Sequence, residues 1–342
     1  MLACRFLAPG EVRVENVPEP AAGPGEAILR VAAASLCASD VRVYRGEKHA
    51  TAGVVVGHEF CGTVVEAGAD SLVRTGDALV VCPILACGRC LYCARGERNR
   101  CPQRRTLGYD VDGGMAEYVR LPAPLLALGH AWPAPPGLPV TRAALVEPSA
   151  CVLGSLERAR VGQGSRLLVL GCGPMGLLHV ALARRMGALA WAFDPAAARV
   201  AVARRLGARV LTDVSPARVA DEVDAPLDAI VVAVGDPAVA AAAVPLARPQ
   251  ATVSWFAGFP PGATATLDAN AVHYGERVVT GSQNARPEQY ERVARMLASM
   301  PEVDSLITDR WPIEDAWQAY EARLGGVGLK GVVLPGPSAE GW

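Results

Sequence analysis

The chain has almost no excess of charge of either sign. Its 33 Lys and Arg residues nearly balance its 34 Asp and Glu residues, which gives a formal net charge of −1 at pH 7. Binding to nucleic acid or to an anionic membrane surface is usually accompanied by a clear basic excess. The composition therefore argues against both kinds of partner and leaves a small molecule as the expected ligand.

The sequence also lacks a long unbroken apolar run. The first 20 residues are interrupted by Pro9 and Glu11 and contain no apolar core of signal-peptide length. The most apolar later stretch, 229–247, is broken by Gly-Asp-Pro at 235–237, and it predicts a buried strand, a turn and a helix rather than a membrane span. There is no internal repeat and no low-complexity linker. We therefore expect a soluble cytoplasmic protein.

Cysteine, by contrast, is frequent. Ten cysteines in 342 residues indicate a reducing compartment and metal binding. Four of them share the stretch CGRCLYCARGERNRC with the spacing C-x2-C-x2-C-x7-C, namely Cys87, Cys90, Cys93 and Cys101. Four thiolates at this spacing can bind one tetrahedral Zn²⁺, and an iron–sulfur cluster is the main alternative. Because a closed four-thiolate site has no open position for a substrate, we predict a structural zinc lobe at 87–101.

The length of the chain and a change in its pattern predict two domains and an α/β fold. The first 145 or so residues contain short β-like runs separated by Gly and Pro. From about residue 163, apolar strands alternate with helices rich in Ala and Arg, which predicts a doubly wound parallel sheet. Strands are expected at 166–171, 189–194, 228–235, 252–258, 276–282 and 330–335, and helices at 174–187, 196–206, 287–299 and 313–324.

A glycine-rich turn indicates a dinucleotide site. Gly171, Gly173 and Gly176 form G-x-G-x-x-G between a predicted strand and a predicted helix, whose N-terminus would face the cofactor phosphates. Asp194 ends the next predicted strand, where its carboxylate can accept hydrogen bonds from both ribose hydroxyls and repel a 2′-phosphate. NAD is therefore predicted in preference to NADP. Arg199 either stacks on the adenine or lies in solvent, and a glycine turn without a ligand is the alternative for the motif itself.

Three further segments carry metal-ligand residues: Cys37, His58 with Glu59, and Glu147. Cysteine, histidine and glutamate are ordinary zinc ligands, and three protein ligands with one open position form a catalytic zinc site. Taken singly, each segment has another interpretation, since a free cysteine is often a small buried hydrophobe and a lone histidine often a hydrogen-bonded core residue.

The order of these motifs resembles the zinc-containing medium-chain dehydrogenase/reductase family, which comprises the alcohol and polyol dehydrogenases. The order is Cys-x-Ser-Asp at 37–40, Gly-His-Glu at 57–59, the cysteine lobe, DGGMAEY at 112–118, Val-Glu-Pro at 146–148, and the glycine motif. The resemblance covers nearly the whole chain. It implies a GroES-like catalytic domain formed by 1–145 and 286–342, a Rossmann NAD-binding domain at 146–285, an active site at the domain boundary, and a homodimer or homotetramer.

The resemblance also assigns roles to the metal-ligand residues. Cys37 and His58 match the two constant ligands of the catalytic zinc, and Glu59 matches the acid that follows the histidine. Glu147 occupies the position of a third cysteine ligand in simple alcohol dehydrogenases, and a glutamate there resembles the sorbitol and threonine dehydrogenase branch. Whether Glu59, Glu147 or both bind zinc varies in that branch. Ser39 matches the hydroxyl of the family's proton relay, or serves as an N-cap or turn serine.

Further cofactor and substrate positions follow from the same resemblance. Arg42 stands where several polyol and threonine dehydrogenases have a histidine, so the proton relay is expected to differ or His49 to serve instead. Arg42 itself either contacts a negatively charged substrate or lies in solvent. Lys330 matches a basic residue that meets the cofactor pyrophosphate. The other positions expected to contact the dinucleotide are Pro174, Met175, Val234, Ala257 and Gly258.

These features predict an enzyme that interconverts a secondary alcohol and a ketone with NAD, one catalytic zinc and one structural zinc. Glu147 favours a polyol, a sugar or a cyclitol, including aminocyclitols such as 2-deoxy-scyllo-inosamine. A simple secondary-alcohol or L-threonine 3-dehydrogenase is one alternative. The other is a non-catalytic NAD- or zinc-binding structural protein, which would be expected to have lost Cys37, His58 or Ser39.

Overall fold

The computed structural model describes residues 1–336 and 342, and the chain divides into two compact units. Unit 1 comprises Met1–Pro148 and Arg286–Trp342, and unit 2 comprises Ser149–Ala285. The first division therefore lies three residues after the predicted boundary at 145, and the second lies at the predicted position. No helix in the described part of the chain combines the length and apolarity needed to cross a bilayer.

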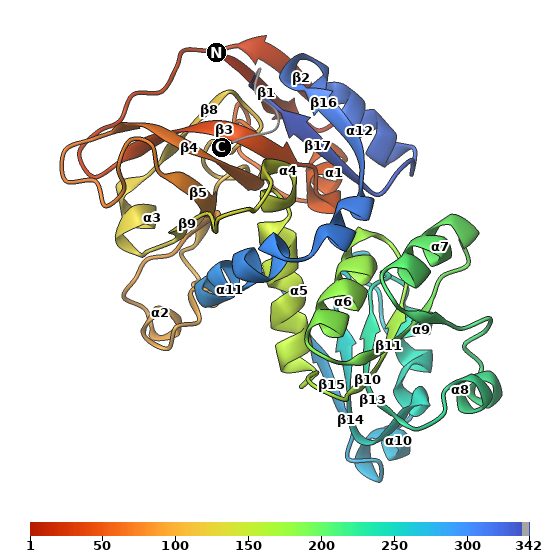
Figure 1. Ribbon diagram of the computed structural model, residues 1–342. Helices are drawn as coiled ribbons and strands as arrows, with labels where there is room; N and C mark the ends of the chain where they lie inside the picture. Colours follow the sequence, from red (N-terminus) through yellow and green to blue (C-terminus); the bar gives the residue numbers. More distant parts are fainter. Residues whose placement is uncertain (337–341) are drawn as a thin grey trace. The chain divides into compact units, whose positions relative to one another are not determined.

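Unit 1 is built on a seven-stranded sheet with the order β16-β17-β3-β4-β5-β9, in which β8 also pairs with β3 (Figure 1). These strands are β3 (Ala27–Ser35), β4 (Glu59–Ala67), β5 (Ala78–Val81), β8 (Tyr118–Leu121), β9 (Ala131–Pro133), β16 (Ile307–Pro312) and β17 (Lys330–Leu334). Val332 of β17 pairs antiparallel with Ser35 of β3, so the C-terminal segment completes the N-terminal sheet. Inward-facing Leu29, Val31 and Phe60 belong to a core cluster of this unit.

Shorter elements surround this sheet. Two-stranded sheets pair β1 (Leu2–Ala8) with β2 (Glu11–Asn16), and β6 (Ile84–Leu85) with β7 (Arg105–Thr106). The helices of unit 1 are α1 (Ala38–Tyr44), α2 (Leu91–Ala94), α3 (Ala123–Ala127), α4 (Val140–Ala143), α11 (Pro287–Ala298) and α12 (Ala316–Leu324), and its 3₁₀ turns are η1 (Arg98–Arg100), η3 (Pro301–Leu306) and η4 (Ile313–Asp315). Helix α12 buries Tyr320 against Val41 and Val43 of α1 in one apolar cluster, which fixes the segment that carries Cys37 and Ser39.

Unit 2 is a six-stranded, fully parallel sheet with the order β12-β11-β10-β13-β14-β15. The strands are β10 (Arg166–Leu170), β11 (Leu189–Phe193), β12 (Arg209–Val210), β13 (Leu227–Val232), β14 (Ala247–Trp255) and β15 (Val278–Gly281). Helix α5 (Val146–Arg158) leads into the unit, which further contains α6 (Pro174–Arg185), α7 (Ala197–Arg205), α8 (Pro216–Glu222), α9 (Pro237–Ala242), η2 (Val244–Leu246) and α10 (Ala269–His273). This strand order is that of a Rossmann fold and confirms the predicted fold class.

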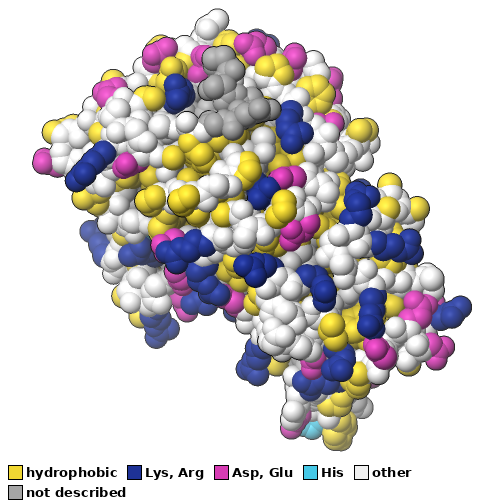
Figure 2. Space-filling model, in the orientation of Figure 1, with side chains coloured by type: hydrophobic (Ala, Val, Ile, Leu, Met, Phe, Trp, Pro, Cys, Tyr) yellow, Lys and Arg dark blue, Asp and Glu magenta, His cyan; other side chains and the backbone are white. Residues whose placement is uncertain are grey.

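Several short elements differ from the sequence-based expectation. Strand β14 begins at Ala247, five residues before its predicted start, and the two-residue strand β12 was not predicted. Helices α8 and α10 were also missed, because each has only one or two turns and a weak apolar periodicity. On the face drawn in Figure 2, basic and acidic side chains are intermixed, in keeping with the balanced composition.

Candidate metal and cofactor sites

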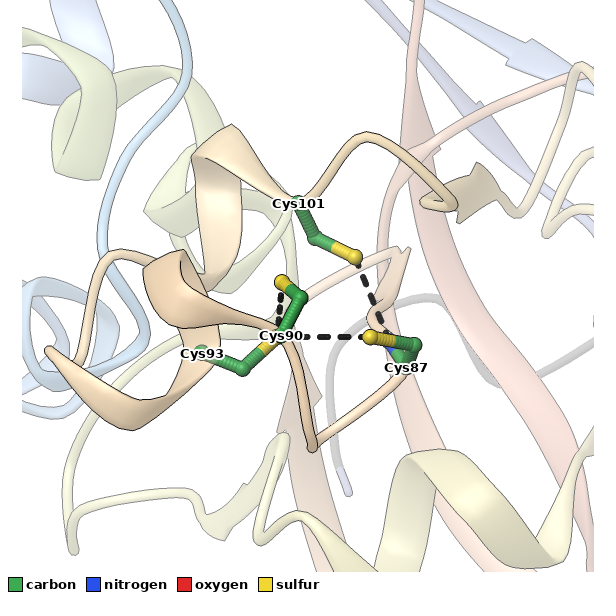
Figure 3. Close-up of side chains that lie close together, drawn as sticks. All are labelled: Cys87, Cys90, Cys93 and Cys101. Carbon is green, nitrogen blue, oxygen red and sulfur yellow. Dashed lines mark hydrogen bonds between the residues drawn. The ribbon is translucent and has the colours of Figure 1, made fainter.

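The loop between β6 and β7 brings the four clustered cysteines together. Their side chains converge in Figure 3, and all four sulfur atoms lie within 4.8 Å of one another. All four thiols are free, and the Cys90–Cys93 sulfur separation of 3.5 Å is far longer than a disulfide bond. The backbone N–H groups of Arg89 and Cys90 lower the pKa of Cys87 to about 6. A thiolate is therefore available in a four-sulfur cage, and this donor set fits Zn²⁺.

A second group combines Cys37, His58 and Glu59, whose ligand atoms also lie within 4.8 Å of one another. Cys37 directly precedes α1, and Glu59 is the first residue of β4. Asp40 connects the two segments: its Oδ2 accepts the Cys37 N–H at 2.9 Å, and its Oδ1 lies 3.1 Å from His58 Nδ1. The first turn of α1 therefore positions both the thiol and the imidazole.

Asp40 also sets the electrostatics of His58. Burial alone would lower the pKa of His58, but the adjacent Asp40 carboxylate reverses this and holds the pKa well above its ordinary value. Burial would likewise raise the pKa of Asp40, but His58 lowers it. Because Asp40 lies at Nδ1, the other ring nitrogen, Nε2, is the one that a metal would bind, in its deprotonated form and in place of the Tyr109 hydroxyl that approaches it at 3.4 Å.

Glu59 provides the observation that tests whether a metal fits. Its side chain is fully buried, and its Oε2 accepts hydrogen bonds from the Ser35 hydroxyl and the Lys330 ammonium. Its Oε1 is also buried but has no hydrogen-bond partner among the described residues. A buried carboxylate oxygen without a donor is costly, and a cation bound by Cys37 and His58 would satisfy it.

Glu147 is not part of this compact group. It lies in the first turn of α5, where its Oε1 accepts a hydrogen bond from Tyr290 OH at 3.5 Å. Tyr290 is itself buried and stacks on Trp132 with ring centroids 5.7 Å apart. Glu147 still acts on the site through its negative charge. It raises the pKa of Lys48, which burial lowers, and it raises the pKa of Tyr109, which burial also raises. The three candidate ligands that the structure brings together are therefore Cys37, His58 and Glu59.

Ser39 lies inside α1 and is not its N-cap, which is Cys37. Its Oγ lies 2.6 Å from Tyr109 OH, and the Tyr109 ring lies 4.9 Å from the His58 ring. Burial, with added repulsion from Asp40, raises the pKa of Tyr109 well above its ordinary value, so its hydroxyl stays protonated. The sequence analysis missed Tyr109, because a lone tyrosine in a loop carries no local signal.

Three further predicted positions lie in unit 1, namely Lys330, Arg42 and His49. Lys330 is 3% exposed, and its ammonium contacts Glu59, Ser35 and the Leu36 carbonyl. The contact between Lys330 and a cofactor pyrophosphate stays a prediction. Arg42 pairs with Glu47 at 3.5 Å, and His49 is exposed.

In unit 2, the glycine motif has the backbone geometry that a dinucleotide requires. Gly171 has φ +98°, and a Cβ there would lie 2.4 Å from Val234 Cγ1. A Cβ on Gly176 would lie 1.8 Å from Gly171 O, so close packing of helix and strand excludes a side chain. Nothing lies within 4 Å of the corresponding position at Gly173, the uncapped N-terminus of α6. This open space beside free N–H groups fits a pyrophosphate.

Asp194 follows β11 and supports the glycine loop. Its Oδ2 accepts the Cys172 N–H and its Oδ1 accepts the Ala196 N–H, both at 2.8 Å. Arg199 lies 3.7 Å from the same carboxylate and forms an ion pair with it, and its stacking on an adenine stays a prediction. Pro174 and Met175 open α6, while Val234, Ala257 and Gly258 lie just beyond β13 and β14, at the ligand-binding edge of such a sheet.

Comparisons with known proteins agree with this arrangement. Residues 23–130 match the family described as the alcohol dehydrogenase GroES-like domain, and residues 141–333, more than half of the chain, match the glucose dehydrogenase C-terminus. L-galactonate-5-dehydrogenase of Escherichia coli K12 is 31% identical over 315 residues, 88% of this chain and 89% of that protein. The chain belongs to the zinc-containing medium-chain alcohol dehydrogenase family.

Other members of this alcohol dehydrogenase family extend the comparison. A zinc-type alcohol dehydrogenase-like protein of Haemophilus influenzae is 33% identical over 202 residues, and this alignment spans 58% of either chain. The crystal structure of a zinc-binding dehydrogenase of Sinorhizobium meliloti bound to NADP superposes with a TM-score of 0.88 at 29% identity, covering 98% of this chain and 99% of that one. As a member of the zinc alcohol dehydrogenases, the protein is an NAD(P)-dependent oxidoreductase.

Proposed function

We propose that the protein reversibly oxidises a secondary alcohol of a polyol, sugar or cyclitol to a ketone, with NAD as the hydride acceptor. The observation that carries this proposal is the compact group of Cys37, His58 and Glu59, which leaves a buried carboxylate oxygen without a donor, next to the hydroxyl of Ser39. A zinc ion held there would act as a Lewis acid that lowers the pKa of the substrate hydroxyl.

The residues around this group have separate tasks. Asp40 orients His58, and Lys330 neutralises Glu59 from the side opposite its unpartnered oxygen. Ser39 Oγ takes up the proton of the substrate hydroxyl and passes its own hydroxyl proton to Tyr109 OH, to which it is already hydrogen-bonded, while Tyr109 gives up its hydroxyl proton to solvent and so stays protonated. Glu147, held by Tyr290, adds negative charge to the site and serves as a reserve carboxylate ligand.

The cofactor preference rests on Asp194. Its carboxylate is held by two backbone N–H groups at the end of β11, where a ribose is expected, and a 2′-phosphate there would be repelled. NAD, when bound, supplies the hydride acceptor. The polyol preference draws on Glu147 and on the similarity to L-galactonate-5-dehydrogenase, an enzyme of a polyhydroxylated acid. A homodimer or homotetramer stays a prediction, to be checked by sedimentation.

The deciding experiment is NAD⁺ reduction by zinc-loaded protein with sorbitol, inositols, 2-deoxy-scyllo-inosamine, threonine and simple secondary alcohols, repeated with NADP⁺. We expect turnover of a polyol or cyclitol with NAD⁺. Cys37→Ser should abolish turnover and remove one zinc per chain. The matched variant Cys101→Ser should remove the other zinc and lower the unfolding temperature, leaving the Cys37 group assembled. Turnover of simple alcohols alone would contradict the proposed substrate class. Turnover with NADP⁺ alone would contradict the proposed preference for NAD.

A further inference from the structure

The chain contains only two lysines, and both lie at the candidate catalytic group. Lys330 is paired with Glu59. Lys48 lies in the loop after α1, and its Nζ lies over the Tyr109 ring, 3.6 Å from the centroid. Because Tyr109 OH contacts Ser39 and approaches His58 Nε2 at 3.4 Å, one aromatic ring separates the Lys48 ammonium from the reacting groups.

Unlike Lys330, Lys48 has no counter-ion in contact. Among the residues that the structure describes, no carboxylate oxygen lies within 4.0 Å of its Nζ, and it donates no hydrogen bond. The acids around it are otherwise engaged: Asp40 holds His58, Glu147 accepts from Tyr290, and the neighbouring Glu47 pairs with Arg42. Burial lowers the pKa of Lys48, which reflects the cost of holding an ammonium there without hydrogen-bond acceptors.

The position of Lys48 needs an explanation beyond packing. A lysine normally extends its ammonium into water while its stem covers apolar surface, yet this one turns its half-buried ammonium onto a ring inside the site. A contact with the face of an aromatic ring leaves the three N–H donors free to meet oxyanion acceptors from another direction. Arg42, which is close enough to lower the Lys48 pKa further, adds a second positive charge to this side of the site.

We propose that Lys48 binds an oxyanion carried by the substrate, either a carboxylate or a phosphate, so that the enzyme prefers a polyhydroxylated acid or a polyol phosphate over a neutral polyol. This inference rests on the proposed function, since it names the substrate class of the same site. Because the Tyr109 ring lies between Lys48 and Ser39, the oxyanion is several bonds away from the carbon that is oxidised.

The kinetic test compares sorbitol, gluconate and sorbitol 6-phosphate with wild-type protein, Lys48→Met and Lys48→Arg. We expect the wild type to favour one anionic compound, and whether this is gluconate or the phosphate identifies the oxyanion. Lys48→Met should lower kcat/KM for that compound by about 10- to 100-fold, mainly through KM, and leave neutral sorbitol almost unchanged. Lys48→Arg should keep part of the preference. An equal loss for all three compounds would show that Lys48 only supports the site and would overturn the inference.

A second test needs neither turnover nor a variant. Lys330 is 3% exposed, so Lys48 is the side-chain amine open to acetylation by acetic anhydride, and mass spectrometry can follow its modification in the zinc-loaded protein. Sorbitol 6-phosphate or gluconate should slow acetylation of Lys48, whereas the same concentration of sorbitol should not. Protection without turnover of any alcohol would support the anion site while contradicting the proposed function. Turnover of sorbitol without protection of Lys48 by either anion, and without a kinetic preference for an anionic compound, would support the proposed function and contradict the anion site.

Discussion

Lys330 and Glu59 form a buried ion pair across strand β3, in which the Ser35 hydroxyl also contacts both partners. The lysine begins β17 and the glutamate begins β4, 271 residues apart in sequence. The pair therefore ties the C-terminal strand of unit 1 to strand β4, which begins with the candidate ligand Glu59 and directly follows the candidate ligand His58. It also leaves one oxygen of Glu59 for a cation, because the ammonium occupies the other.

Removing Lys330 should destabilise unit 1 strongly. Lys330→Met leaves the fully buried Glu59 carboxylate without its counter-ion, and breaking such a pair costs about 3–5 kcal/mol. Urea unfolding followed by tryptophan fluorescence measures this loss. The double variant Lys330→Met/Glu59→Gln, which removes both charges, should recover part of the stability. A double variant as unstable as the single one would show that packing, and not the unpaired charge, dominates.

The hydroxyl of Tyr109 should matter for turnover through Ser39. Tyr109→Phe keeps the ring beneath Lys48 but removes the hydrogen bond to Ser39 Oγ, so we expect kcat to fall by about tenfold or more with unchanged zinc content. Steady-state kinetics of Tyr109→Phe, Ser39→Ala and the double variant check this. If the two groups act in one relay, the double variant resembles Ser39→Ala. Multiplicative losses would indicate independent roles.

Two substitutions of Asp194 should separate its charge from its support of the glycine loop. Asp194→Asn retains a side-chain oxygen that can accept the Cys172 N–H but removes the negative charge, so the ratio of kcat/KM for NADP⁺ to that for NAD⁺ should rise by about tenfold. Asp194→Ala removes the acceptor as well and should weaken both cofactors. An unchanged ratio in Asp194→Asn would mean that this charge does not select the cofactor.

Mild acid should destabilise unit 2 through His179. This residue of α6 is fully buried, its Nδ1 lies 2.7 Å from the Met175 carbonyl, and burial lowers its pKa from 6.5 to about 4. The unfolded chain therefore binds more protons between these two values, and stability is lost as the pH falls through this range. Between pH 7 and pH 5 the loss amounts to about 2 kcal/mol.

Urea unfolding of wild-type protein and His179→Leu at pH 7 and pH 5 tests this assignment. The leucine cannot be protonated, so the variant should lose about 2 kcal/mol less than the wild type over the same interval. His130, whose pKa burial also lowers to about 4, remains in both proteins and cancels in the comparison. An identical pH dependence in the two proteins would assign the acid sensitivity to other groups.

Features with a short sequence span were predictable from the sequence. The cysteine lobe closes within fifteen residues, and the glycine turn lies between a strand and a helix that follow each other directly, so spacing alone predicted the assembly of both. The alternation of apolar strands and helices likewise predicted the parallel sheet of unit 2. The short elements β12, α8 and α10 were missed, because two to seven residues give too weak a periodic signal.

The sequence by itself determined the chemical inventory: four clustered thiols, a glycine-rich phosphate turn, and a cysteine, a histidine and glutamates able to bind zinc. Only the tertiary structure decided which of these groups contact one another. In the folded chain, Lys330 forms an ion pair with Glu59, and Tyr109 is hydrogen-bonded to Ser39. Tyr290 donates a hydrogen bond to Glu147, and the Lys48 ammonium lies over an aromatic ring without a counter-ion in contact. These pairings join residues far apart in the chain. Buried charged and polar groups need partners, and which partner each group meets depends on the complete sheet of unit 1.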